Sequence, residues 1–122
     1  MDSTLLSHFL PKGLLEHFTI TSINDLEDSV SKDKYFEIEL SENNILLRSD
    51  ANEYESKGFT EITLQDFPIR GKAVYLKIKR RRWRHKLRPK EQVRNDFSFV
   101  AVGSGFTQEL SDFLKGRGKY KG

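Results

Sequence analysis

The residues of this chain that could do chemistry are concentrated in one short basic segment. Ten of the 21 Lys and Arg side chains lie between Lys77 and Arg94, where Glu91 is the one acidic residue. The rest of the chain holds more acidic than basic side chains, so the formal net charge of +3 conceals a strongly polarised sequence. Guanidinium and ammonium groups at this density are typical of a surface that binds nucleic-acid phosphates. The segment is therefore a predicted nucleic-acid-binding site.

The predicted DNA-binding residues all lie within this segment and carry cationic or aromatic side chains. They are Lys77, Lys79, Arg80, Arg81, Arg82, Trp83, Arg84, Lys86, Arg88, Lys90 and Arg94. The four arginines between positions 80 and 84 are candidates for direct contact with DNA, and the remaining cations are expected to neutralise phosphates. Trp83 has two interpretations, a buried core anchor or an exposed surface that stacks on or wedges between bases.

The spacing around these cations predicts a strand that positions them. Between residues 73 and 84, Val74, Leu76 and Ile78 alternate with polar side chains. The polar positions are Tyr75, Lys77, Lys79 and Arg81. Side chains two residues apart on a strand are separated by about 7 Å, which is close to the phosphate spacing of a nucleic-acid strand. We therefore expect one face to enter the core and the other to present a ladder of cations.

Other segments must hold this strand in place, and their patterns predict an α+β fold. The expected sheet is small and antiparallel, with a long basic β-hairpin at residues 72–102, short N-terminal helices and a C-terminal helix. Expected helical segments are residues 3–10, 14–18 and 107–115, and expected strands are residues 18–23, 35–40, 59–64, 73–84 and 96–102. We expect residues 49–58 to form a connecting loop. Residues 1–115 are expected to form a single domain, followed by a flexible basic tail at residues 116–122.

Composition excludes several classes of site. The chain has no cysteine, which rules out disulfides and thiolate zinc sites. His8, His17 and His85 alone make a poor ligand set, so no metal or other cofactor is expected. No apolar run reaches membrane-spanning length, and the N-terminal sequence, interrupted by Pro11, differs from a secretory signal, so we expect a cytoplasmic protein.

A second charged region lies upstream of the basic segment and has the opposite sign. Between Asp25 and Glu61 there are eleven acidic side chains and four basic ones. These carboxylates form either a solvated acidic surface or a counterbalance that shapes how the basic segment meets DNA. Their spacing does not suggest a catalytic pair or a metal site, so no enzymatic activity is expected.

The C-terminal half of the chain resembles the N-terminal regions of bacterial insertion-sequence transposases, particularly the short reading frames that precede a catalytic transposase frame in Bacteroidetes. The family has a D-x-P-x-x-G-x-x-V strand followed by an R-R-x-R-C-x-x-C knuckle. The residues that match this pattern are Asp66, Pro68, Gly71, Val74, Arg81, Arg82 and Arg84. The pattern departs at residues 85–88, which read His-Lys-Leu-Arg where the family has its zinc-binding cysteines. A metal-free hairpin held by its apolar face is therefore expected.

The resemblance implies an accessory module that recognises the ends of the element, without catalysis of its own. Its implied partners are double-stranded DNA at the transposon ends and a separately encoded catalytic transposase subunit. Two alternatives stay open at this point. The basic strand could dock on an acidic surface of the catalytic subunit as a protein adaptor. Alternatively, Trp83 and Tyr75 could stack on the bases of RNA or of single-stranded DNA.

Overall fold

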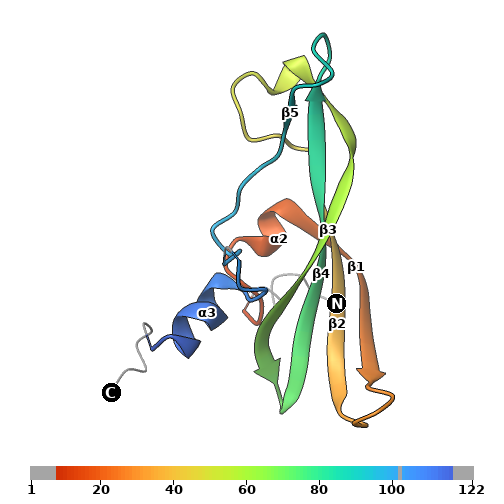
Figure 1. The fold of residues 1–122 in the computed structure, drawn as a ribbon, viewed down its shortest axis with the longest axis vertical. Helices are drawn as coiled ribbons and strands as arrows, with labels where there is room; N and C mark the ends of the chain where they lie inside the picture. The colour runs from red at the N-terminus through yellow and green to blue at the C-terminus, as the bar shows by residue number, and fades with distance from the viewer. Residues whose placement is uncertain (1–7, 102, 117–122) are drawn as a thin grey trace.

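The computed structural model describes residues 8–101 and 103–116, and its centre is strand β4. The elements in chain order are α2 (Leu14–His17), β1 (Phe18–Glu27), β2 (Lys34–Glu42), the 3-10 helix η1 (Ala51–Glu53), β3 (Tyr54–Ile69), β4 (Lys72–His85), β5 (Gln92–Val93) and α3 (Gln108–Leu114). They form a five-stranded sheet in the order β1-β2-β4-β3, with β5 paired to β4. A short helix lies near the N-terminal side and another near the C-terminal end, which confirms the predicted α+β class (Figure 1).

The sheet is mixed because β4 runs parallel to one neighbour and antiparallel to the others. It pairs antiparallel with β3 from Lys72 to His85 and parallel with β2 from Ala73 to Lys79. β2 in turn pairs antiparallel with β1. β1 and β2 cover the lower half of the molecule, while β3 and β4 continue upward with η1 and β5 (Figure 1). We call this projecting part, residues 43–59 and 80–95, the arm.

The predicted basic hairpin at residues 72–102 is wrong in its second strand. The partner of β4 is the preceding strand β3, joined to it by a tight turn in which Arg70 and Gly71 both have positive φ, 52° and 78°. This is the backbone that a two-residue hairpin turn with the twist of a β-ribbon requires. On the other edge of β4, β2 occupies residues 73–79 and β5 pairs with residues 83–84, so the three residues left between them cannot pair with the whole of residues 96–101.

Residues 96–101 cover the core instead of extending the sheet. Phe97 and Phe99 stack with ring centroids 5.4 Å apart, and both meet Phe18 edge-on. Together with α2 they lie over one face of the sheet. The alternation that suggested a strand is therefore a pattern of aromatic side chains packing on that face.

The predicted apolar face of the basic strand is confirmed. Val74, Leu76 and Ile78 are fully buried, and Leu40 of β2 and Leu64 of β3 lie in the same core cluster. Burying side chains of this size stabilises the fold by about 1.5–3 kcal/mol each, so this row fixes which face of β4 is internal. The charged residues between them necessarily point to the other face.

Most of the remaining expected elements are also present. α2 confirms the helical turn at residues 14–18, and β1, β2 and β3 contain the strands expected at 18–23, 35–40 and 59–64. α3 confirms the C-terminal helix, with Thr107 at its N-cap accepting a hydrogen bond from the Leu110 amide. The loop expected at residues 49–58 is wrong, because η1 and the first residues of β3 lie there. The helix expected at residues 3–10 falls largely outside the described residues, as does the tail at 117–122.

Among the described residues, the structure contains no helix that is long and apolar enough to cross a membrane.

Asp66 anchors the start of α3 to the sheet. It is 3% exposed, and its carboxylate accepts a hydrogen bond of 2.8 Å from the Thr107 hydroxyl. The Thr107 amide also donates to the Gln65 carbonyl of β3. Burial raises the pKa of Asp66 above its ordinary value of 3.8, and the bonds from Thr107 and the Phe67 amide oppose this shift without cancelling it. An ionised Asp66 therefore destabilises the folded state relative to a neutral side chain.

We predict that Asp66→Asn raises the free energy of unfolding at neutral pH. The asparagine keeps an acceptor for Thr107 and removes the buried charge. Because the folded pKa lies above the unfolded one, the gain is complete above the folded pKa and disappears as the pH falls below about 3.8. Urea unfolding at a series of pH values measures this, with the exposed Asp33→Asn as the control. An Asp66→Asn protein less stable than the parent at neutral pH would contradict it.

Candidate nucleic-acid interface

The arm has its own small core, and Trp83 is its centre. The indole is 2% exposed and packs in a cluster with Leu46 and Tyr54. Its Nε1 donates a hydrogen bond of 3.0 Å to the Asn44 side chain. The interpretation of Trp83 as a buried anchor is therefore confirmed. Its prediction as a DNA-contacting residue is corrected, because a buried indole presents no face to a base.

Trp83 and the main core lie on opposite sides of β4. Buried positions fall on even-numbered residues up to Arg80 and on odd-numbered residues from Trp83 to His85. At the same level β3 has a bulge between Ser56 and Gly58, where two steps along β3 oppose one step along β4. A bulge of this kind changes which face the following side chains take and increases the local twist. The arm can therefore bury a second cluster while remaining continuous with the sheet.

Arg80 is a buried residue and not a surface contact, which corrects its prediction as an exposed DNA-binding arginine. It is 8% exposed, and its Nη2 donates to the Asn95 carbonyl at 2.5 Å and lies 3.6 Å from the Asp96 carboxylate. It follows Ile78 on the internal face of β4, and this position explains its burial. The internal row predicted from the sequence ends at Ile78, and the charge of Arg80 assigned it to the surface, although the same alternation continues to it.

Asn95 joins three segments at the base of the arm. Its Nδ2 donates to the Glu42 carboxylate at 2.8 Å and to the Ile45 carbonyl at 2.9 Å, and its Oδ1 accepts from the Leu47 amide at 2.9 Å. Glu42, only 2% exposed, also accepts from the Arg81 backbone amide. These bonds satisfy buried polar groups that would otherwise be costly, and they fix the 43–50 loop against β4.

Many of the predicted contact residues are already paired with carboxylates of the chain itself. Lys77 lies 4.0 Å from Glu37 and 3.7 Å from Glu61, which flank it on β2 and β3. The other pairs are Arg84 with Glu55 at 3.0 Å, Arg88 with Glu91 at 2.8 Å and Arg94 with Asp96 at 3.8 Å. The second interpretation of the upstream carboxylates, as a counterbalance to the basic segment, holds at Glu37, Glu55 and Glu61. The ladder on β4 is consequently less positive than its sequence suggests.

The arm also holds cations that form no ion pair with a side-chain carboxylate in residues 8–101 and 103–116. They are Lys57, Arg81, Arg82, Lys86 and Lys90. Lys79, just below the arm, is likewise unpaired and exposed in this part of the chain. Lys57 was missed at the sequence level because it lies outside the basic segment, in a stretch with acidic neighbours. The pairing of β3 with β4 is what brings it to the arm.

Arg81 is held in place without being neutralised. Its Nε donates to the Glu42 carbonyl at 3.2 Å and its Nη1 to the Ser56 hydroxyl at 2.8 Å. The guanidinium also lies over the Phe59 ring, 4.6 Å from the centroid. Because these contacts already order the Arg81 side chain, it would lose less conformational entropy when it binds a phosphate.

His85 organises the tip of the arm, between β4 and β5. It is 2% exposed, and its Nδ1 accepts hydrogen bonds of 3.1 Å from the amides of Leu87 and Arg88. Its Nε2 lies 3.4 Å from the Glu53 carboxylate. An Nδ1 that accepts two amides must be unprotonated, so the hydrogen of the neutral ring is on Nε2. His85 therefore has a structural role in the tip. It stands at the position of a zinc-binding cysteine in the transposase pattern that the sequence resembles.

Comparison with protein-family models, curated proteins and solved structures found no match to this chain. The resemblance to transposase regions therefore stays a prediction from the residues that carry it. In the described part of the chain, no group of three or more His, Asp or Glu side chains is arranged to hold a metal ion.

We predict that Asn95→Ala lowers the free energy of unfolding by about 2–4 kcal/mol, because it removes the partner of Glu42 Oε2, of the Ile45 carbonyl and of the Leu47 amide in a largely buried setting. Urea unfolding at neutral pH measures the loss. Asn52→Ala, an exposed asparagine of η1, is the matched control and should change stability by less than about 0.5 kcal/mol. Equal effects of the two substitutions would show that the Asn95 bonds do not hold the arm.

We predict that His85→Ala loosens the tip while the sheet stays folded. Loss of the Nδ1 acceptor leaves the Leu87 and Arg88 amides unbonded, at a cost of about 1–3 kcal/mol. Hydrogen exchange should show faster exchange at these two amides, with the amides of Leu76 and Ile78 unchanged. His85→Asn, whose Oδ1 can accept the same amides, should restore part of the protection, and exposed His8→Ala should have no effect. Unchanged exchange at Leu87 and Arg88 in His85→Ala would contradict this.

Proposed function

We propose that this chain is a DNA-binding accessory module without catalysis of its own, and that the arm is its contact surface. The observation that carries the proposal is the group of five arm cations that form no carboxylate pair in the described residues. They are Lys57, Arg81, Arg82, Lys86 and Lys90. A cation that is not already paired with a carboxylate gains most from a phosphate, because binding then releases counterions without breaking an internal ion pair.

The charge of the whole arm supports this assignment. Residues 43–59 and 80–95 contain ten Lys and Arg side chains and four Asp and Glu side chains. The rest of the chain is balanced or acidic, so the field of the molecule orients the arm toward a polyanion. The lower sheet face, where Lys77 lies between Glu37 and Glu61, contributes much less.

The shape of the arm is also suitable. It projects beyond β1 and β2 along the long axis, so a duplex can approach it without meeting the lower sheet (Figure 1). Its frame is the antiparallel pair β3 and β4, and a two-stranded ribbon is among the elements that enter a DNA major groove. The transposase resemblance would make the ligand the ends of an insertion sequence, and the partner a separately encoded catalytic subunit.

The structure bears on the two alternatives, single-strand binding and a protein adaptor, in different ways. Binding of RNA or single strands by stacking loses its main candidate, because Trp83 is buried, and Tyr75 already meets Tyr35 edge-on at 5.7 Å. A protein adaptor would dock the basic strand on an acidic surface, and the pairing of Lys77 with Glu37 and Glu61 makes that part of the strand less positive. The adaptor would use the lower sheet face and the DNA-binding module the arm, so variants distinguish them.

We predict that the triple variant Lys57→Gln, Lys86→Gln, Lys90→Gln binds duplex DNA more weakly and with a shallower salt dependence. The slope of log affinity against log salt should fall by up to about three, close to one for each lost phosphate contact. Fluorescence anisotropy with a labelled duplex at several salt concentrations measures it. The matched control removes three exposed lysines outside the arm, Lys12, Lys34 and Lys115, and should keep nearly the parental slope.

Equal slopes for the two triple variants would show that charge in general, and not the arm, binds DNA. Specificity is tested with duplexes from the ends of the element that encodes the chain and with shuffled duplexes of the same length. Tighter binding to the ends supports end recognition, and equal affinity contradicts it. A catalytic partner that is still captured by the arm variant, with DNA binding absent in the parent, would favour the adaptor.

A further inference from the structure

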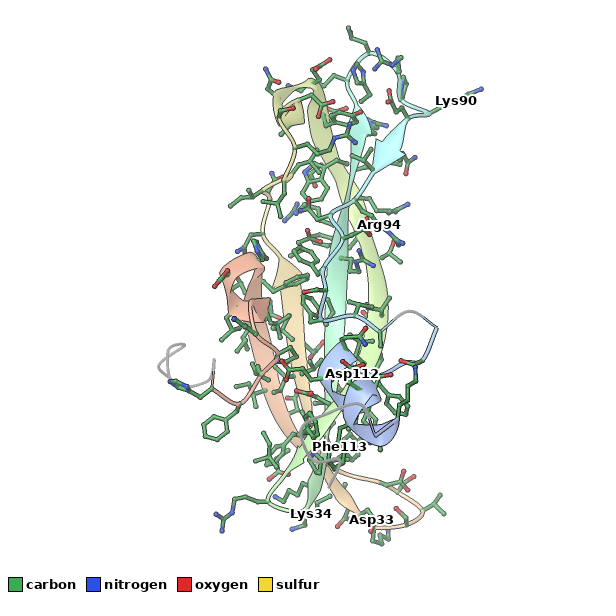
Figure 2. All side chains as sticks on the ribbon, turned by 90° about the vertical axis from the view of Figure 1, so that its left-hand side faces the viewer. Asp33, Lys34, Lys90, Arg94, Asp112 and Phe113 are labelled. Carbon is green, nitrogen blue, oxygen red and sulfur yellow. The ribbon has the colours of Figure 1, made fainter. Side chains whose placement is uncertain are left out.

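A cavity of about 600 Å³ lies at the base of the arm, on the internal face of the sheet. One side is formed by β3, through Ile62 and Leu64, and the other by the segment that follows β5, through Phe97 and Ala101. Arg94, also in its lining, lies along the long axis between Lys90 near the tip and Asp112 of α3 (Figure 2). This volume lies within the range of pockets that bind small organic ligands.

The polar groups of the cavity are gathered in a few consecutive or neighbouring residues. Arg80 and Arg94 both line it, together with Asp96. The Asp96 carboxylate lies 3.6 Å from Arg80 Nη2 and 3.8 Å from Arg94 Nε, so one carboxylate faces two guanidiniums. Its side chain is 88% exposed, which makes it a weakly held partner that solvent screens.

Arg80 has an unused donor beside the cavity. Its side chain is nine-tenths buried, and its Nε is buried without a hydrogen-bond partner in the described structure. A buried donor left unpaired is costly, and a charged one more so. Burial lowers the pKa of the Arg80 guanidinium, and repulsion from Arg94 adds to this effect. An anion placed between the two arginines would offset the repulsion between their guanidiniums.

We propose that this cavity binds a small amphipathic carboxylate, with its head group on Arg80 and Arg94 and its apolar body against Ile62, Leu64 and Phe97. The planar guanidinium fork suits a carboxylate, and the apolar wall gives the rest of the ligand a surface to leave water. In the absence of a ligand, the Asp96 carboxylate occupies the place between the two guanidiniums that the carboxylate of the ligand would take. The site is separate from the arm cations proposed to contact DNA, and its success or failure does not depend on theirs.

The test uses sodium decanoate as the probe and decan-1-ol as its uncharged counterpart, with binding followed by NMR shifts of the full chain. We expect decanoate to shift the amides of Ile62, Leu64 and Ala101 and to bind about tenfold more tightly than decanol. Arg94→Gln should weaken decanoate binding several-fold, and Asp96→Asn should strengthen it, because both guanidiniums lose their shared carboxylate partner. Lys90→Gln, which removes an exposed cation at the tip, should leave it unchanged.

The gain expected for Asp96→Asn separates a ligand site from a purely structural ion pair, since loss of a structural pair has no reason to increase affinity. Equal binding of decanoate and decanol, with shifts spread over exposed apolar residues such as Phe9 and Leu87, would overturn the proposal. Absence of shifts at Ile62 and Ala101 in both the parent and Asp96→Asn would overturn it as well. DNA is not present in this experiment, so its outcome bears on the cavity alone.

Discussion

Strand β4 is paired with β3 along one edge, and along the other with β2 from Ala73 to Lys79 and with β5 at Trp83 and Arg84. This arrangement lets one strand carry two very different rows of side chains. Its internal positions in the lower half are fully buried and apolar, and the same strand then continues into the arm with arginines at successive positions. At residues 80–82, between its two partner strands on that edge, the Glu42 carboxylate accepts a hydrogen bond from the Arg81 amide and so satisfies a backbone donor there.

The buried polar groups at the base of the arm follow from this extension. Once β2 ends at Glu42, the loop that leaves it must be tied to β4 by other means. Asn95 supplies the bonds, and Glu42 and Arg80 are buried beside it. Buried charges of this kind are not an efficient source of stability, but they restrict the ways in which the loop and the strand can meet. The base of the arm is thus specified by polar complementarity, whereas the lower core is specified by apolar packing.

Internal ion pairing divides the basic segment into two kinds of cation. Those facing acidic strands, such as Lys77 and Arg84, are partly neutralised where they stand. Those at the bulge and the tip, such as Lys57 and Lys90, have no carboxylate partner in the described chain. Surface pairs contribute little to stability, so their main effect is on the electrostatic field, which they weaken around Lys77 on the lower face and around Arg84 and Arg88 within the arm.

The local pattern of the sequence was enough to determine the strand at residues 73–84, its internal face at Val74, Leu76 and Ile78, and the capped helix that begins after Thr107. These features depend on alternation and capping, which act between residues close in the chain. The order of the strands was decided by tertiary structure. The alternating residues 96–101 matched a strand, but β3 had already taken the edge of β4 through the Arg70–Gly71 turn, and the phenylalanines packed on the core. Likewise, the burial of Arg80 and Trp83, and the arrival of Lys57 beside them, depend on a bulge and on contacts between residues far apart in sequence, which periodicity cannot record.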